Sequence, residues 1–151
     1  MELKHGLHLA YCTNIHRGED WAQTFDSLKT DVLSVRDRVS EGKAYAIGLR
    51  LSDLASRELS EPAVLDNFKQ WLVDENCYVF TINGFPYGNF HGTRVKEQVY
   101  LPDWTSPDRL EYTNRLFELI AALAPEGVEG SVSTLPGSFK EFITEESQEQ
   151  Q

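Results

Sequence analysis

The pattern of apolar residues predicts helices in three stretches of the chain. In the first stretch, apolar residues recur at spacings of four and three, which places them along one face of a helix of about five turns. They are Trp21, Phe25, Leu28, Val32, Val35 and Val39. Helical spacing recurs at Val64, Leu65, Phe68 and Leu72, and again at Leu110, Thr113, Phe117, Ile120 and Ala124.

Polar residues and prolines mark the predicted helix ends. Side-chain oxygens of Asp and Ser accept hydrogen bonds from the first turn of a helix, and proline fits there because its missing N–H needs no partner. Such start signals stand at Asp20 with Gln23, at Ser52 with Asp53 (a brief helix to Leu59), at Pro62 and at Ser106 with Pro107. Gly42 and Asn76 suit the left-handed conformation that ends a helix.

Four short apolar runs between these helices predict strands at 7–13, 44–51, 78–82 and 128–134. Strands that alternate with helices favour right-handed crossovers around a parallel sheet. We therefore expect an α/β protein with four strands and three main helices, either a small doubly wound sheet or half of an eight-stranded β/α barrel. Because no helix is predicted after the fourth strand, the repeat looks cut short. The domain is expected over 1–140, with a charged, flexible tail at 141–151.

The charge and composition of the chain make some binding partners and cellular locations less expected than others. The 151 residues carry a net charge of -10, which argues against nucleic acid or an anionic membrane surface as the partner. No apolar run has the length of a membrane span, and residues 1–9 lack the order of a secretory signal. Two cysteines, Cys12 and Cys77, do not make a disulfide framework. We expect them to be reduced core thiols, in or beside buried strands, in a cytoplasmic protein.

The stretch from Asn83 to Lys96 has the most distinctive composition in the chain. It opens a loop of about 23 residues between two predicted regular elements, and loops of that length in compact domains are usually functional or disordered. Its aromatic residues and glycines favour an ordered binding loop, in which His91, Arg94 and Lys96 can hold an anionic or polyhydroxylated ligand. The charged residues can equally be solvated, and the aromatic residues can equally form a small core that orders the loop.

In β/α proteins, ligand-binding residues gather at the carboxyl ends of strands. Residues selected by that position are Thr13, Asn14 and His16 after the first strand, Arg50 and Ser52 after the second, Asn83 and the long loop with Tyr87 after the third, and Ser133 and Thr134 after the fourth. A loop histidine either binds a ligand or stabilises its own loop, and the sequence leaves both readings open. The chain has no histidine or cysteine spacing typical of a metal site, no glycine-rich phosphate loop and no pair of carboxylates at strand ends.

Six segments of the chain resemble the EboE metabolite-traffic proteins, which are related to the xylose isomerase-like sugar phosphate isomerases and epimerases. The segments are YCTNIH at 11–16, GLRLS at 48–52, TINGFPYG at 81–88, FHGTRVK at 90–96, VYLPDW at 99–104 and GVEGSVST at 127–134. The similarity extends over roughly residues 6–140.

This resemblance implies that the chain is the N-terminal half of a xylose isomerase-like TIM barrel. Within it, His91 and Lys96 are candidates for catalysis. Candidates for substrate binding are Asn14, His16, Arg50, Asn83, Tyr87 and Arg94. In the wider superfamily a divalent metal, Mn²⁺ or Mg²⁺, is held largely by acidic residues and histidines of the later strands. A metal is therefore expected in the full-length protein, and no metal or other cofactor is expected for this chain alone.

Two functions follow from the resemblance. One is a protein of metabolite traffic that binds a polar or sugar-like small molecule, such as a secondary-metabolite precursor, without chemistry of its own. The alternative is an active metal-dependent sugar or sugar phosphate isomerase or epimerase when the protein is full length. The exposed sheet edges of a half barrel also allow self-association.

Overall fold

The structure, a computed structural model, describes residues 1–40, 42–88 and 97–143. Its centre is a sheet of four parallel strands in the order β1-β2-β3-β4. The strands are β1 (Ala10–Cys12), β2 (Tyr45–Arg50), β3 (Cys77–Asn83) and β4 (Ser131–Ser133). This arrangement confirms the predicted α/β class with a parallel sheet. Most of the predicted tail at 141–151 lies outside the described residues.

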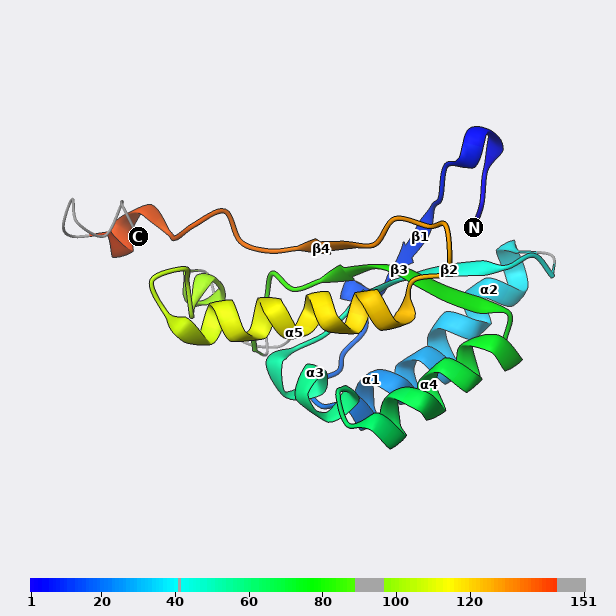
Figure 1. Cartoon of the computed structure of the whole chain (residues 1–151), viewed down its shortest axis with the longest axis horizontal. Helices are drawn as coiled ribbons and strands as arrows, with labels where there is room; N and C mark the ends of the chain where they lie inside the picture. The colour runs from blue at the N-terminus through cyan, green and yellow to red at the C-terminus, as the bar shows by residue number, and fades with distance from the viewer. Residues whose placement is uncertain (41, 89–96, 144–151) are drawn as a thin grey trace.

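Helices connect each strand to the next and lie on one side of the sheet (Figure 1). Between β1 and β2 run α1 (Trp21–Ser27), the π-helical segment η3 (Leu28–Val32) and α2 (Leu33–Val39). The β2–β3 connection holds α3 (Asp53–Leu59) and α4 (Pro62–Asp74), and the β3–β4 connection holds α5 (Pro107–Leu123). Short 3₁₀ turns are η1 (Lys4–Gly6), η2 (Thr13–Ile15), η4 (Gln98–Tyr100) and η5 (Lys140–Phe142).

Helix caps stand where the sequence predicts them. The Asp20 carboxylate accepts from the Gln23 backbone N–H at 2.8 Å, and the Ser52 hydroxyl accepts from the Ala55 N–H at 3.0 Å. Ser106 caps α5 in the same way. Gly42 and Asn76 adopt φ values of 79° and 51°, the left-handed conformation that follows a helix. Local sequence therefore sets the boundaries of these helices.

The two outer strands are shorter than the sequence predicts. β1 keeps three residues of the predicted 7–13 because the residues before it pair with the chain start instead. There the Leu9 N–H donates to the Met1 carbonyl at 2.8 Å, and Glu2 forms an antiparallel bridge with His8. β4 keeps three residues of the predicted 128–134, because Val128 still belongs to the turn that follows α5, with its N–H bonded to the Pro125 carbonyl.

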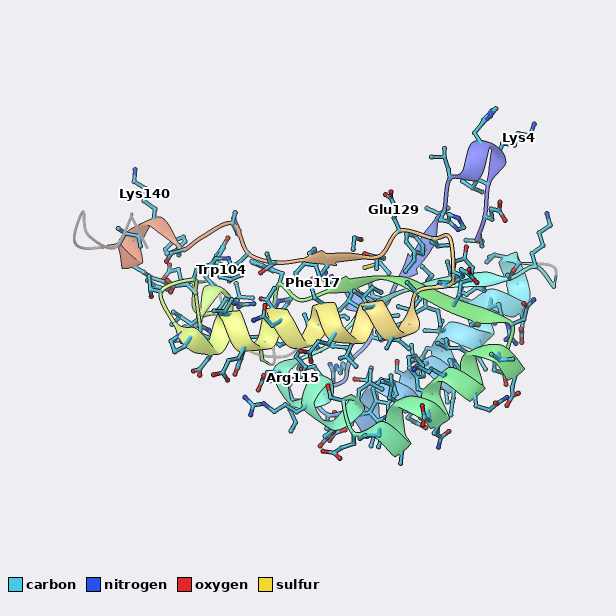
Figure 2. All side chains as sticks on the ribbon, in the orientation of Figure 1. Lys4, Trp104, Arg115, Phe117, Glu129 and Lys140 are labelled. Atoms are coloured by element: carbon cyan, nitrogen blue, oxygen red, sulfur yellow. The ribbon has the colours of Figure 1, made fainter. Side chains whose placement is uncertain are left out.

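The predicted helix faces are right in part. Trp21, Leu28 and Val32 are buried as predicted, but Val39 is exposed, because the wider π-helical turn shifts the face of the helix that follows it. In α5, Leu110 and Phe117 are about half exposed (51% and 52%), and Figure 2 labels Phe117 on this helix. Thr113 and Ile120 are buried as predicted, and the same face also holds Arg109, Tyr112, Leu116, Leu119 and Leu123.

The hydrophobic core lies between the helices and one face of the sheet. Tyr45, Ile47 and Leu49 of β2 belong to this core, together with residues from every α-helix except α2. Alternation along a strand places Ala46 and Gly48 on the opposite face. The sheet therefore has one face covered by helices and one face without them.

That opposite face is concave. Cα atoms of β1 and β3 approach within 8 Å of one another, whereas next-nearest strands of a flat sheet lie about 9.5 Å apart. A Cβ atom at Gly48 would stand 3.4 Å from Ala10 Cβ and 3.4 Å from Thr81 Cγ2, so the side chains of β1 and β3 converge above β2. A bulge at β3 between Val79 and Thr81 adds to the bend.

Among the described residues, no helix is both long and apolar enough to span a bilayer. The two cysteines are free thiols, as predicted. Cys77 is buried, and burial raises the pKa of its thiol. Cys12, in contrast to the expectation of a core thiol, is exposed at the end of an edge strand.

Candidate functional site

Residues at the carboxyl ends of the strands lie along one edge of the sheet. Arg50 of β2 is in register with Asn83 of β3, and Asn83 is in register with Ser133 of β4. Cys12 ends β1 opposite Gly48. The predicted site residues Asn14, His16, Arg50, Asn83 and Tyr87 lie at this edge or in the loops that leave it. His91, Arg94 and Lys96 lie outside the described residues.

Arg50 joins two of these loops. Its guanidinium donates from Nη1 to the Gly18 carbonyl at 2.5 Å and from Nη2 to the Gly88 carbonyl at 2.9 Å. Its backbone N–H donates to Thr13 Oγ1 at 2.9 Å. The side chain is buried, and burial lowers the pKa of its guanidinium. Arg50 thus fixes the loop after β1 against the loop after β3, and both of its terminal nitrogens are engaged within the protein.

A small cavity lies beside Arg50 and extends to His16 and Thr24. Its volume is about 10 Å³, which is the space of about one water molecule. Arg50, Thr13 and Gly18 contribute to its walls. The cavity is therefore too small to hold a sugar.

His16 contacts two side chains. Its Nε2 lies 2.9 Å from the Tyr11 hydroxyl, and its Nδ1 lies 3.4 Å from the Asp31 carboxylate. Asp31 belongs to the π-helical segment η3, an irregularity that is often found at functional sites. The ring of Tyr11 packs against the core, so this histidine sits at the β1 edge of the protein rather than above the concave face.

Asn83 and Gly84 form the start of the long loop. The Asn83 side-chain oxygen accepts from the Phe85 N–H at 3.0 Å, which makes a tight turn. The Gly84 N–H donates to the Ser133 carbonyl at 2.9 Å. A Cβ atom at Gly84 would stand 2.3 Å from Leu116 Cδ1, so α5 and β4 leave no room for a side chain. The loop therefore leaves the sheet in close contact with both elements.

Arg109 is a structural residue that the sequence analysis missed. It is fully buried, and its guanidinium donates to three carbonyls: to Pro102 at 2.7 Å, to Gly84 at 2.9 Å and to Phe85 at 3.3 Å. Burial lowers the pKa of this guanidinium. Arg109 thus ties the first residues of the long loop to the segment that leads into α5. Its spacing from Tyr112, Leu116 and Leu123 on the same face is the signal in the sequence.

Tyr87 packs beside this arginine. Its ring lies 5.1 Å from the ring of Tyr112 and 5.7 Å from the Arg109 guanidinium, measured between centres. Its carbonyl accepts from the Asp53 N–H at 2.8 Å. Burial, with a smaller contribution from Asp53, raises the pKa of its hydroxyl. Tyr112 donates to the Leu51 carbonyl at 2.5 Å, so both tyrosines help to hold the loops after β2 and β3 together.

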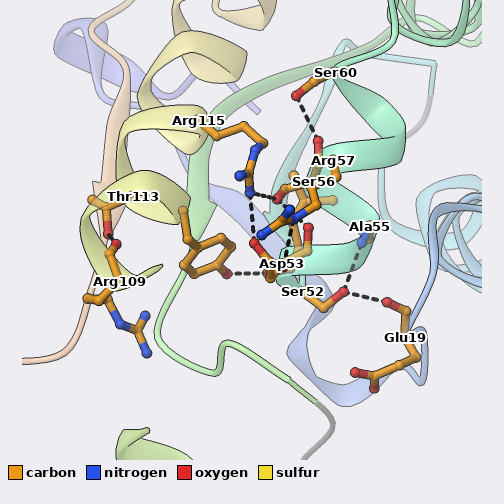
Figure 3. A network of polar contacts seen from close by, with 12 residues as sticks. Glu19, Ser52, Asp53, Ala55, Ser56, Arg57, Ser60, Arg109, Thr113 and Arg115 are labelled. Atoms are coloured by element: carbon orange, nitrogen blue, oxygen red, sulfur yellow. Dashed lines mark hydrogen bonds and ion pairs between the residues drawn. The ribbon is translucent and has the colours of Figure 1, made fainter. Parts of the chain in front are cut away.

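A polar network fixes α3, the helix that directly follows β2 (Figure 3). The Asp53 carboxylate accepts from Arg115 at 2.8 Å and from Arg57 at 2.9 Å. Arg115 also donates to the Ser56 hydroxyl at 3.1 Å. Arg57 and Asp53 belong to α3, whereas Arg115 belongs to α5. The ion pair between Asp53 and Arg115 therefore links the two helices.

Asp103 anchors the segment after β4. Its carboxylate accepts from the hydroxyls of Ser138 and Thr105 and from the Thr105 N–H. Burial alone would raise the pKa of Asp103, but these hydrogen bonds, with the nearby charge of Arg109, hold it below its usual range. Trp104 adds a bond from its indole N–H to the Leu135 carbonyl at 2.9 Å.

The described part of this edge offers hydrogen-bonding groups rather than a set of reacting groups. Cys12, Ser133 and Thr134 are exposed, and Asn14, His16 and Asn83 are half-buried. The carboxylates of Asp53 and Asp103 serve structural contacts. Over residues 1–40, 42–88 and 97–143, no group of three or more His, Cys, Asp or Glu side chains is arranged to hold a metal ion.

Comparison of the chain with protein-family models, with curated proteins and with solved structures found no match. The resemblance to the EboE proteins stays a prediction.

Proposed function

We propose that the chain forms part of a β/α barrel of the xylose isomerase-like type and binds a small polar molecule, of sugar or polyol class, at the carboxyl edge of its sheet. Doubly wound sheets reverse their strand order and carry helices on both faces. Here the strands follow chain order, the helices lie on one side and the other face is concave, which supports the barrel.

The contacts of Arg50 carry the binding proposal. They connect the loop after β1 to the loop after β3 at the edge where parallel sheets bind ligands. A site whose loops are already fixed loses less conformational entropy when a ligand binds. Gly88, which Arg50 holds, precedes the predicted ligand residues His91, Arg94 and Lys96 by only a few positions in the sequence.

The chemistry of the edge indicates the class of ligand. Hydroxyl and amide groups of Ser133, Thr134 and Asn14 can exchange hydrogen bonds with sugar hydroxyls. The carboxylates of Asp53 and Asp103 near this edge are already engaged, which favours binding over acid–base catalysis. A role in metabolite traffic in the cytoplasm belongs to the same proposal, and no observation favours the isomerase or epimerase alternative over it.

Binding is tested by saturation-transfer NMR of the whole chain with D-xylose, myo-inositol and ribose 5-phosphate, followed by calorimetry on the strongest binder. We expect Lys96→Ala to weaken that binding about ten-fold or more, because a charge-assisted hydrogen bond contributes about 1.5–3 kcal/mol.

Lys43→Ala is the matched control, because Lys43 is exposed just before β2, at the opposite edge of the sheet. Equal affinities for the Lys96 and Lys43 variants, or no binding of any of the three compounds, would contradict the proposal.

A further inference from the structure

Two tyrosines of the sheet are hydrogen-bonded to histidines. The Tyr11 hydroxyl of β1 lies 2.9 Å from His16 Nε2, and the Tyr78 hydroxyl of β3 lies 2.9 Å from His8 Nδ1. A phenol hydroxyl can donate to an imidazole nitrogen that carries no proton. The two pairs share this contact, and they differ in what lies beside the other nitrogen of the ring.

The other nitrogen of His16 lies beside a carboxylate. Asp31 Oδ2 is 3.4 Å from His16 Nδ1, and the same oxygen accepts from the Ser27 hydroxyl at 3.1 Å. Because an ionised carboxylate can only accept, it favours the tautomer with the proton on Nδ1, which leaves the lone pair of Nε2 facing Tyr11. Within residues 1–40, 42–88 and 97–143, His8 has no such ion pair with a carboxylate.

Local structure brings Tyr11, His16 and Asp31 together. The 3₁₀ turn η2 follows β1 and is closed by the His16 N–H, which donates to the Thr13 carbonyl at 3.0 Å. The chain thereby turns back, and the ring centres of His16 and Tyr11 lie 5.7 Å apart. Asp31 comes from the π-helical segment η3, and single π turns within α-helices are frequent at functional sites.

The Tyr11 hydroxyl is a neutral phenol. Its ring packs against the core, and burial, with smaller contributions from Asp31 and Cys12, raises the pKa of the hydroxyl. A phenol that loses an electron becomes a strong acid, so its oxidation is easier when a base within hydrogen-bond distance takes the proton in the same step. His16 Nε2 is in the position of that base.

We propose that Tyr11, His16 and Asp31 form a redox site, in which Tyr11 gives one electron to an oxidant at the protein surface and its hydroxyl proton to His16. The oxidant is a one-electron acceptor of the organic peroxyl radical class. It takes the electron from Tyr11 and a proton from water, and becomes a hydroperoxide. Tyr11 becomes a neutral tyrosyl radical, and His16 becomes an imidazolium that faces the Asp31 carboxylate.

A reductant such as ascorbate completes the cycle. It returns one electron to the Tyr11 radical and releases one proton to the solvent, which replaces the proton that the hydroperoxide took. The proton on His16 Nε2 goes back to the Tyr11 oxygen. Electrons and protons therefore balance, and the protein ends in its starting state.

A second tyrosine extends the site into the core. The ring of Tyr45 in β2 lies 6.2 Å from the ring of Tyr11, and Tyr45 is 1% exposed. An oxidised Tyr45 can therefore be reduced by Tyr11, whose proton acceptor is already in place. The site would carry oxidising equivalents from the core to the surface. Because it needs no bound sugar, it is independent of the binding function proposed above.

The test is flash oxidation of the whole chain with photogenerated tris(bipyridine)ruthenium(III), with the tyrosyl radical followed by optical absorption and electron paramagnetic resonance. The chain has 6 tyrosines, so Tyr11→Phe identifies the contribution of Tyr11. We expect a fast phase of radical formation that Tyr11→Phe removes. In the wild type this phase should be slower in D₂O, because a proton moves in the same step. His16→Phe should slow it about ten-fold or more, because the base is lost.

The carboxylate is tested separately. Asp31→Asn should slow the fast phase about two- to five-fold, as expected for the loss of a partly exposed ion pair. Asp66→Asn, at an exposed position of α4, is the matched control and should keep the wild-type rate. His8→Phe removes the histidine that contacts Tyr78 and should also leave the fast phase unchanged.

A fast phase that survives Tyr11→Phe, equal rates in H₂O and D₂O, or equal rates for the Asp31 and Asp66 variants would overturn the inference. A loss in His8→Phe as large as that in His16→Phe would overturn it too. Far-ultraviolet circular dichroism of each variant separates loss of the fold from loss of the redox site. The D₂O comparison uses the wild type alone, so it decides the question even when a variant at His16 unfolds.

Discussion

Two buried arginines hold the loops of the candidate site. Arg50 and Arg109 are 4% and 0% exposed, and both give their guanidinium N–H groups to backbone carbonyls. A buried charge is tolerated when its hydrogen bonds are made. Although burial lowers the pKa of both side chains, arginine stays charged in proteins at neutral pH. Through these hydrogen bonds, Arg50 joins the loops after β1 and β3, and Arg109 joins the loop after β3 to the segment before α5.

Arg109→Met should destabilise the protein by about 2–4 kcal/mol, because three carbonyls lose their partner and become unsatisfied inside the protein. The measurement is urea unfolding followed by circular dichroism. Arg38→Met, at an exposed position of α2, is the control and should change stability by less than about 0.5 kcal/mol. Equal free energies of unfolding for the two variants would show that the hydrogen bonds of Arg109 do not stabilise the protein.

Sequence reasoning found the elements and missed part of their packing. The caps at Asp20, Ser52 and Ser106 are local signals, and the structure confirms all three. In α5, Thr113 and Ile120 are buried as predicted, whereas Leu110 and Phe117 are about half exposed, because a pattern of apolar residues alone leaves out the other residues of the buried face. That face includes Arg109 and Tyr112, whose burial depends on loop carbonyls that are distant in sequence.

The same limit applies to the candidate site. Arg50 and Asn83 each come at the end of a predicted strand, and in the structure they lie side by side at one edge, because the carboxyl ends of parallel strands meet there. Arg50 donates to the backbone carbonyls of Gly18 and Gly88. Because every residue has a backbone carbonyl, residue type does not reveal these partners. Whether a polar residue binds a ligand or fixes a loop is therefore decided by tertiary contacts.

Gly84 lies in close contact with α5 and β4, which predicts that this position tolerates no side chain. Gly84→Ala should destabilise the protein by about 1–3 kcal/mol, because the new methyl group would collide with Leu116 and crowd the Ser133 carbonyl. Gly88→Ala is the control in the same loop. A Cβ atom there has its nearest neighbour at 4.0 Å, so its unfolding midpoint in urea should stay near the wild-type value. Similar losses at both positions would contradict the packing described for Gly84.

The sheet as a whole has one face covered by helices and one concave face. Its hydrogen-bonding groups collect at the carboxyl edge, around Arg50 and Asn83. A second, larger hollow of about 280 Å³ lies at the opposite edge, between Arg36, Lys43 and Asn76. We propose that the ligand binds at the carboxyl edge, where the loops are fixed, and not in this hollow at the amino edge.

The most direct measurement is a titration of ¹⁵N-labelled protein with the strongest binder among D-xylose, myo-inositol and ribose 5-phosphate, observed by amide chemical shifts. We predict that the largest shifts fall on Thr13 to Gly18 and on Asn83 to Gly88, with little change near Lys43 and Asn76. Shifts centred on Arg36, Lys43 and Asn76, or no shifts at saturating ligand, would contradict a binding site at the carboxyl edge.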